Sequence, residues 1–252
     1  MLTVPNKINW HGKFVGIDHR DQCSDQQHFD QYSKVVQYDH NSKGFRDEEW
    51  PSDLQNVVWC VGDSFTVGLG QPHTETWPYL LQKRTGRRCL NIGENGASND
   101  FIATRSKQII KEHPNCDIVI MWSYFNRRLK WDIDAGKDEN VPIDPNDWGY
   151  EADMKNFADN FLSVCKLQPK AIHLLVPNAL TFMKQKYNKK IFITLLKKIK
   201  VLNNGTVEEV NWNIDQFKKI LFYSQQDYAR DGHHFDIKTS QSIVGLVSEL
   251  LE

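Results

Sequence analysis

The sequence lacks a long apolar run. No stretch of its 252 residues approaches the roughly 18 consecutive apolar residues that a membrane-spanning helix needs. The segment from Met1 to Lys13 alternates polar and apolar side chains and contains no apolar centre of a secretory signal. We therefore expect a cytoplasmic protein without a membrane span.

An excess of charge of one sign is also missing. Lysine and arginine together number 31, aspartate and glutamate 32, and the net charge is −1. No overall field then favours nucleic acid or an anionic membrane, so we expect neither as a partner. With 40% hydrophobic and 25% charged residues, the composition suits a sizeable core in a chain of α/β type.

Cysteine pairing motifs are absent as well. The five cysteines are odd in number, and no two have the Cys-x-x-Cys spacing that is typical of metal or redox sites. Three of them, Cys60, Cys89 and Cys116, lie in or beside predicted strands. We expect small buried thiols in a reducing compartment.

What is present is an alternation of strand and helix patterns. The sequence is polar up to about residue 55, and we interpret residues 1–55 as an extension packed on a core of residues 56–252. Residues 132–149 form an expected loop or lid. Strands are expected at 57–61, 88–92, 117–122, 171–176 and 207–212, and helices at 75–85, 98–112, 151–167, 184–200 and 239–251. This alternation predicts a three-layer α/β/α fold with a mostly parallel, five-stranded sheet.

Residues suited to chemistry follow the first predicted strand, at the sheet edge where such folds bind ligands. The tripeptide Gly62-Asp-Ser64 places a serine on a tight turn near a helix N-terminus, where backbone N–H groups favour negative charge. Thr66 excludes the GxSxG elbow of α/β-hydrolases, and the lack of a following GK[ST] excludes a phosphate loop. Alone, the tripeptide equally fits a turn with a helix-capping serine.

Three further segments have comparable positions. Asn91 to Ser98 follows the second strand and contains glycines, which permit close backbone approach, and Asn126 follows the third. Asp231 precedes His234 by one local turn, so its carboxylate can hold the imidazole in the tautomer that a general base needs. Each segment alone also fits an ordinary turn or polar loop, but their joint occurrence in this order points to a serine-based site.

Together these segments resemble the SGNH/GDSL hydrolase family, whose sequence blocks carry serine, glycine, asparagine and histidine. The first, second and last blocks resemble Gly62 to Thr66, Asn91 to Gly96 and Asp231 to His234. Asn41 to Arg46 also resembles a segment that precedes the serine in many bacterial and phage members. The third block departs from the usual Gly-x-Asn-Asp, because Tyr124-Phe-Asn-Arg127 keeps only the asparagine.

The resemblance implies a flavodoxin-like fold and an esterase that uses a catalytic triad, with no cofactor and no metal. Ser64 is then the nucleophile, His234 the base that accepts its proton, and Asp231 the carboxylate that orients the base. The backbone N–H groups of Ser64 and Gly96 and the side-chain amide of Asn126 would form the oxyanion hole. The expected substrate is a small-molecule or carbohydrate ester.

Several alternatives stay open at this point. His233 neighbours the expected base, and Asp227 is a weaker candidate for the orienting acid. The same triad would serve an acyltransferase in which an alcohol replaces water. A non-catalytic member of the family, acting as a binding or structural protein in a virion for example, is a third possibility. The sequence predicts neither the acyl group nor the oligomeric state.

Overall fold

A single parallel sheet forms the centre of the protein, for which a computed structural model describes residues 11–125, 127–132, 137–142, 150–175, 201–203, 206–208, 219–223 and 225–251. Its strands are β3 (Val58–Gly62), β4 (Cys89–Gly93), β5 (Asp117–Trp122), β8 (Ile172–Leu175) and β11 (Ile220–Phe222). They lie in the spatial order β11-β8-β5-β3-β4, and every neighbouring pair is parallel. The chain runs from β3 outward to β4 and then crosses back to β5, which reverses the strand order. In parallel sheets this reversal opens a crevice at the carboxyl ends of the strands.

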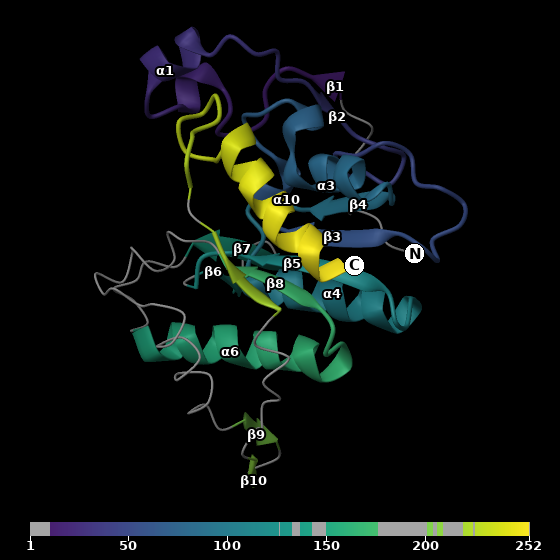
Figure 1. Cartoon of the computed structure of the whole chain (residues 1–252). Helices are drawn as coiled ribbons and strands as arrows, with labels where there is room; N and C mark the ends of the chain where they lie inside the picture. Colours follow the sequence, from purple (N-terminus) through teal and green to yellow (C-terminus); the bar gives the residue numbers. More distant parts are fainter. Residues whose placement is uncertain are drawn as a thin grey trace.

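Helices cover both faces of the sheet (Figure 1). Helices α3 (Trp77–Thr85) and α10 (Ile237–Leu251) lie together on one face. Helices α4 (Asn99–Glu112) and α6 (Tyr150–Leu167) lie together on the other. The predicted three-layer α/β/α fold with a five-stranded parallel sheet is therefore confirmed.

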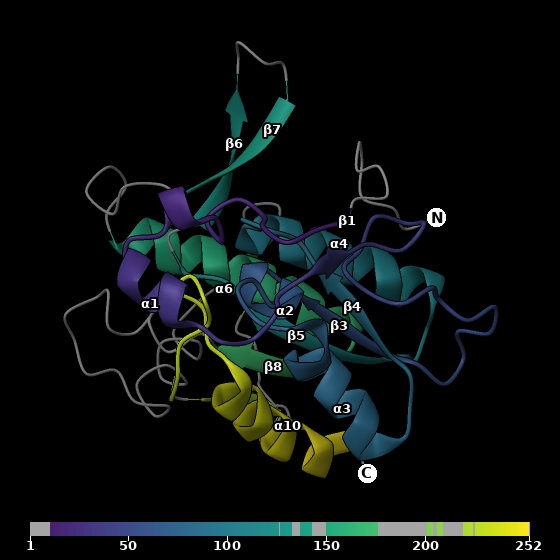
Figure 2. The same ribbon diagram turned by 90° about the horizontal axis from the view of Figure 1, so that it is seen from above.

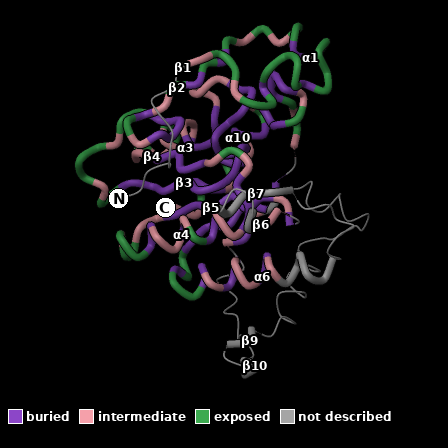
Figure 3. The backbone as a smooth tube through the Cα atoms, turned by 180° about the vertical axis from the view of Figure 1, so that it is seen from behind, coloured by how far each residue is buried: buried purple, intermediate pink, exposed green. Residues whose placement is uncertain are grey.

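The continuous apolar run of β3 follows from its place between the two helical layers. Successive side chains of a strand point to opposite faces. Val58 and Cys60 accordingly join the core cluster under α3 and α10, whereas Trp59 and Val61 join the cluster under α4 and α6. All four are buried, and the buried backbone follows the sheet in Figure 3. A strand covered on both faces is apolar throughout, which is why a continuous apolar run, and not an alternation, predicted it.

The position expected for the fifth strand was wrong. The fifth strand is not at 207–212 but at β11, which pairs with β8, while β10 (Thr206–Glu208) pairs with β9 (Val201–Asn203) in a separate hairpin. Such short strands carry little periodicity, so their pattern does not distinguish a core strand from a hairpin arm.

The expected loop at 132–149 is partly a hairpin. Strands β6 (Arg127–Asp132) and β7 (Lys137–Pro142) pair antiparallel and project from the body of the molecule (Figure 2). Most of their residues are charged or polar, and Trp131 and Val141 alone belong to the aromatic and β-branched types that usually signal strands, so the pattern did not predict the hairpin. The helix expected at 184–200 lies outside the described residues.

In the described part of the segment before β3, residues 11–57, all elements are short. They are β1 (His11–Gly12), the 3-10 turn η1 (Arg20–Gln22), α1 (Gln26–Gln31) and β2 (Tyr38–Asp39). Val36 and Tyr38 are buried in a cluster with Val67 and Leu69, just beyond β3. The division of the chain between residues 55 and 56 stays a prediction.

Three further features of the described residues concern helices, cysteines and a helix cap. None of the described helices combines the length and the apolar character that crossing a membrane requires. The five cysteines are free; four are buried and Cys116 is partly buried. Helix α4 begins at its expected cap, where the Ser98 hydroxyl oxygen accepts a hydrogen bond from the Phe101 N–H at 3.2 Å.

Candidate active site

Ser64 lies at the carboxyl end of β3, where the strand order reverses. It is the first residue of the short helix α2 (Ser64–Val67). Asp63 caps this helix, because its carboxylate accepts a hydrogen bond from the Phe65 N–H at 3.1 Å. Gly68 ends the helix in a left-handed conformation, with φ at 76°. The GDS tripeptide thus forms a strand-to-helix turn that fixes the serine at the predicted edge of the sheet.

The other oxygen of the Asp63 carboxylate has partners that sequence reasoning missed. Oδ2 accepts a hydrogen bond from the Ser123 hydroxyl at 2.6 Å, and Arg127 Nη1 lies 3.7 Å from it. Ser123 follows β5, and its N–H donates to the Asn99 side-chain oxygen at 3.0 Å. These contacts tie the turn of Ser64 to the ends of β5 and α4. The sequence carries no local signal for these contacts, except that Asn99 directly follows Ser98, the expected cap of α4.

Asp231 and His234 lie on one tight turn before α10. The Asp231 carboxylate accepts the N–H groups of His233 and His234, both at 2.9 Å, through Oδ1. Its Oδ2 lies 2.6 Å from His234 Nδ1. Burial alone would raise the pKa of Asp231, but the facing imidazole and these hydrogen bonds hold that pKa below its ordinary value. The carboxylate is therefore charged and oriented toward Nδ1.

Ser64 and His234 meet across the sheet edge although 170 residues separate them. The distance between Ser64 Oγ and His234 Nε2 is 2.7 Å. With Asp231 accepting the proton of Nδ1, the tautomer assigned from this network leaves Nε2 free to accept the serine proton. The ring of Phe65 packs against the imidazole, with centroids 4.6 Å apart. Ser64 and His234 are both almost fully buried, at 3% and 1% exposure. The structure thus brings together the three residues that the sequence singled out.

The two weaker candidates have other contacts. Asp227 accepts hydrogen bonds from the N–H groups of residues 236, 238 and 239 and from the Thr239 hydroxyl, so its carboxylate organises the start of α10. The His233 ring packs edge-on against the His234 ring, with centroids 5.0 Å apart, and burial lowers the pKa of this histidine. Neither side chain joins the hydrogen-bonded chain of Ser64, His234 and Asp231.

Two of the three expected oxyanion donors lie in the described part of the chain. Among the described residues, no acceptor occupies the N–H of Ser64 or of Gly96. Gly96 has φ at +75° on the turn after β4, and open space surrounds the place where a β-carbon would be. Asn126 lies outside the described residues, and its expected role stays a prediction.

Gly93, at the end of β4, provides a test of how α2 is held. A β-carbon there would lie 2.5 Å from the Val67 backbone nitrogen and 2.9 Å from the Thr66 carbonyl carbon. Backbone atoms cannot swing aside, so Gly93→Ala must shift α2 and should reduce the free energy of unfolding by roughly 1–3 kcal/mol or more. Urea unfolding measures this change.

Gly245, within α10, is the matched control. Nothing lies within 4 Å of a β-carbon placed there. Since alanine is the better helix former, Gly245→Ala should raise the free energy of unfolding by about 0.5–1 kcal/mol. If Gly93→Ala were as stable as the wild type, the close packing of α2 on β4 would be contradicted.

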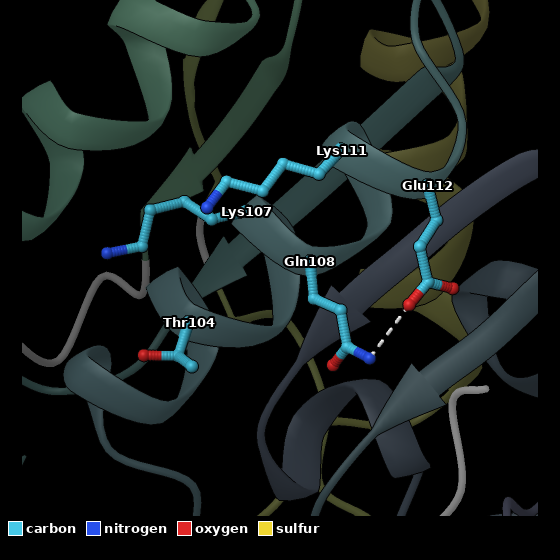
Figure 4. A pocket seen from close by; sticks show the side chains of 5 residues that line it. All are labelled: Thr104, Lys107, Gln108, Lys111 and Glu112. Carbon is cyan, nitrogen blue, oxygen red and sulfur yellow. Dashed lines mark hydrogen bonds between the residues drawn. The ribbon is translucent and has the colours of Figure 1, made fainter.

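Other places that could hold a ligand offer less. The described residues contain no cluster of three or more histidine, cysteine or acidic side chains arranged for a metal ion. A shallow hollow on the outside of α4 is lined by side chains of that one helix (Figure 4). Its lysines extend along the surface, and Gln108 donates a hydrogen bond to Glu112 at 3.0 Å. Ser64, His234 and Asp231 do not line this hollow.

Comparison with known proteins gives a likeness in structure only. No family model matches the sequence, and no curated protein matches it. The solved structure of TesA is 16% identical with a TM-score of 0.46, covering 78% of this chain and 98% of that one. A putative lipolytic protein of the G-D-S-L family from Desulfitobacterium hafniense DCB-2 is 12% identical with a TM-score of 0.46, covering 77% and 99%. Esterase EstA from Pseudoalteromonas sp. is 12% identical with a TM-score of 0.45, covering 78% and 96%.

All three TM-scores are below 0.5, so the fold described above rests on this chain's own strand order and pairing. That order and the parallel direction of all five strands agree with the three-layer α/β/α fold predicted from the sequence.

Proposed function

We propose that this protein is a serine hydrolase that cleaves an ester bond. The observation that supports this most is the unbroken chain of short contacts from Ser64 Oγ to His234 Nε2, at 2.7 Å, and from His234 Nδ1 to Asp231 Oδ2, at 2.6 Å. Both distances lie within the range for proton transfer between a nucleophile, its base and the group that orients the base. These three side chains lie at the switch point of the parallel sheet, where α/β proteins bind ligands.

The proposed reaction has two halves. Ser64 Oγ attacks the ester carbonyl carbon while His234 Nε2 takes the hydroxyl proton, and the charged Asp231 stabilises the imidazolium. The tetrahedral intermediate then expels the alcohol, which receives that proton, and leaves an acyl group on Ser64. Water attacks the acyl-enzyme with His234 again as base, which releases the acid and restores the serine.

The negative oxygen of each intermediate needs donors. The N–H groups of Ser64 and Gly96, for which no described residue supplies an acceptor, are suited to this, and Ser64 adds the N-terminus of α2. One such donor typically lowers the barrier by about 3 kcal/mol. Asn126 is the proposed third donor.

The two adjacent histidines allow a sharp test of this assignment. His234→Gln should reduce kcat for aryl acetates by about 10³-fold or more, because glutamine cannot accept the serine proton at neutral pH. His233→Gln should keep most of the activity, since its backbone N–H to Asp231 is retained. Equal rates in His234→Gln and His233→Gln would overturn the assignment of the base.

A panel of aryl esters of rising chain length and acetylated sugars, with and without an alcohol acceptor, would identify the acyl group and distinguish hydrolysis from transfer.

A further inference from the structure

The loop that carries Asp231 and His234 is held by the beginning of the chain. We call residues 229–236 the acid–base loop. In Figures 1 and 2 the N-terminal segment around α1 lies beside this loop, which leads into α10. The contacts between residues 13–34 and the acid–base loop join positions about 200 apart in the sequence.

The centre of this contact is a buried ion pair. Asp18 is fully buried, and its Oδ1 accepts a hydrogen bond from Arg230 Nε at 2.9 Å. Arg230 Nη2 and the Tyr38 hydroxyl both donate to Oδ2 of the same carboxylate. The backbone of Arg230 is fixed too, because its N–H donates to the Gly70 carbonyl at 2.9 Å. Since Arg230 directly precedes Asp231, these contacts fix the backbone position from which the Asp231 side chain extends.

Backbone carbonyls at this end of the loop have partners from the same segment. The Cys23 thiol donates to the Asp231 carbonyl at 3.0 Å. His28 Nε2 lies 2.7 Å from the Ala229 carbonyl oxygen. Arg230 Nη2 also donates to the Lys13 carbonyl at 2.6 Å. The first three residues of the acid–base loop are therefore each held by a residue of the N-terminal segment.

A second anchor holds the far end of the loop. Lys34 Nζ pairs with Asp236 Oδ2 at 2.8 Å and with Glu75 at 2.6 Å. The Tyr32 hydroxyl donates to the same Asp236 oxygen at 3.1 Å. His234 thus lies between two anchored points, one at Arg230 and one at Asp236.

The segment also passes the turn that carries Gly96. Gly16, with φ at +54°, lies near this turn, since a β-carbon placed on it would be 3.5 Å from Asn95 Nδ2, an ordinary van der Waals distance. The N-terminal segment therefore contacts the acid–base loop and passes near the turn after β4.

We propose that residues 13–34 act as a clamp that positions Asp231 and His234 for catalysis, with Asp18 as its principal positioning residue. This inference rests on the proposed function. Proton transfer requires hydrogen-bond reach between Ser64 Oγ and His234 Nε2, and a displacement of about 1 Å can cost about 10²-fold in rate. None of the clamp contacts involves Ser64, so the clamp acts on the reaction only through the loop.

The test is Asp18→Asn, which keeps the size of the side chain and removes the charge that faces Arg230. We expect kcat for an aryl acetate to fall about 10- to 100-fold per folded molecule, with KM changed by less than about threefold. Lys34→Met, which removes the partly exposed second anchor, should give a smaller loss of the same kind and keeps the test valid if Asp18→Asn does not fold.

Asp30→Asn is the matched control, because it breaks the exposed pair with Arg20 (2.8 Å) in the same segment without touching the acid–base loop. It should leave kcat unchanged. Folded fractions are measured by circular dichroism at the assay temperature. Unchanged kcat in both Asp18→Asn and Lys34→Met, or a loss that only matches the unfolded fraction, overturns the clamp. An inactive wild type overturns the proposed function instead.

Discussion

Ser64→Ala is expected to reduce kcat for an aryl acetate by about 10³-fold or more. Ser64 Oγ is the atom that lies 2.7 Å from the imidazole, and alanine leaves His234 with no hydroxyl proton to accept. The substitution removes a single oxygen atom, so we expect the fold to persist. Steady-state rates at saturating substrate measure the effect.

A serine elsewhere serves as the control for this substitution. The Ser42 hydroxyl donates to Glu49 at 2.7 Å on the surface, and Ser42→Ala should retain the wild-type kcat. Thermal unfolding of both variants separates lost chemistry from lost structure. A Ser64→Ala protein that hydrolyses the ester at the wild-type rate would refute the nucleophile.

Asp231→Asn is expected to have the second large effect, a fall in kcat of about 10³- to 10⁴-fold. An asparagine amide can turn its NH₂ toward His234 Nδ1, which then becomes an acceptor and moves the ring proton to Nε2. A protonated Nε2 cannot take the proton of Ser64. KM should change far less than kcat, because the carboxylate orients the base and does not contact the substrate.

The charge of Asp231 in the wild-type protein, and its contribution to stability, depend on pH. The pKa of Asp231 is held below its ordinary value by His234 and the backbone N–H groups, despite burial. The carboxylate therefore stays charged as pH falls through the weakly acidic range, and it contributes stability there that is lost only when pH falls through this lowered pKa. An Asp231→Asn variant with an unchanged kcat would mean that His234 is oriented by another group.

The sequence predicted the parts of the fold and the site that depend on local patterns. The buried strand ending at Gly62, the Ser98 cap and the one-turn spacing of Asp231 and His234 are each encoded within a few residues. The rule that ligands bind at the carboxyl ends of parallel strands then placed Ser64 near His234. The structure places the two at 2.7 Å, as that reasoning required.

What the sequence did not predict depends on long-range contacts or very short elements. Asp18 and Arg230 are 212 residues apart, and nothing near either one indicates the other. The pairing of Asp63 with Ser123 likewise appears only once β3 and β5 are neighbours. β11 is three residues long, too short for a period to distinguish it from the hairpin arms around it.

The most direct test of the central claim is the reaction of the wild-type protein with a fluorophosphonate, followed by peptide mapping in the mass spectrometer. Such a probe phosphonylates a serine only when an adjacent base makes its hydroxyl nucleophilic. We predict a single adduct on Ser64, absent from Ser64→Ala and strongly slowed in His234→Gln. A folded protein that remains unlabelled, or that carries the adduct on another residue, would contradict the account.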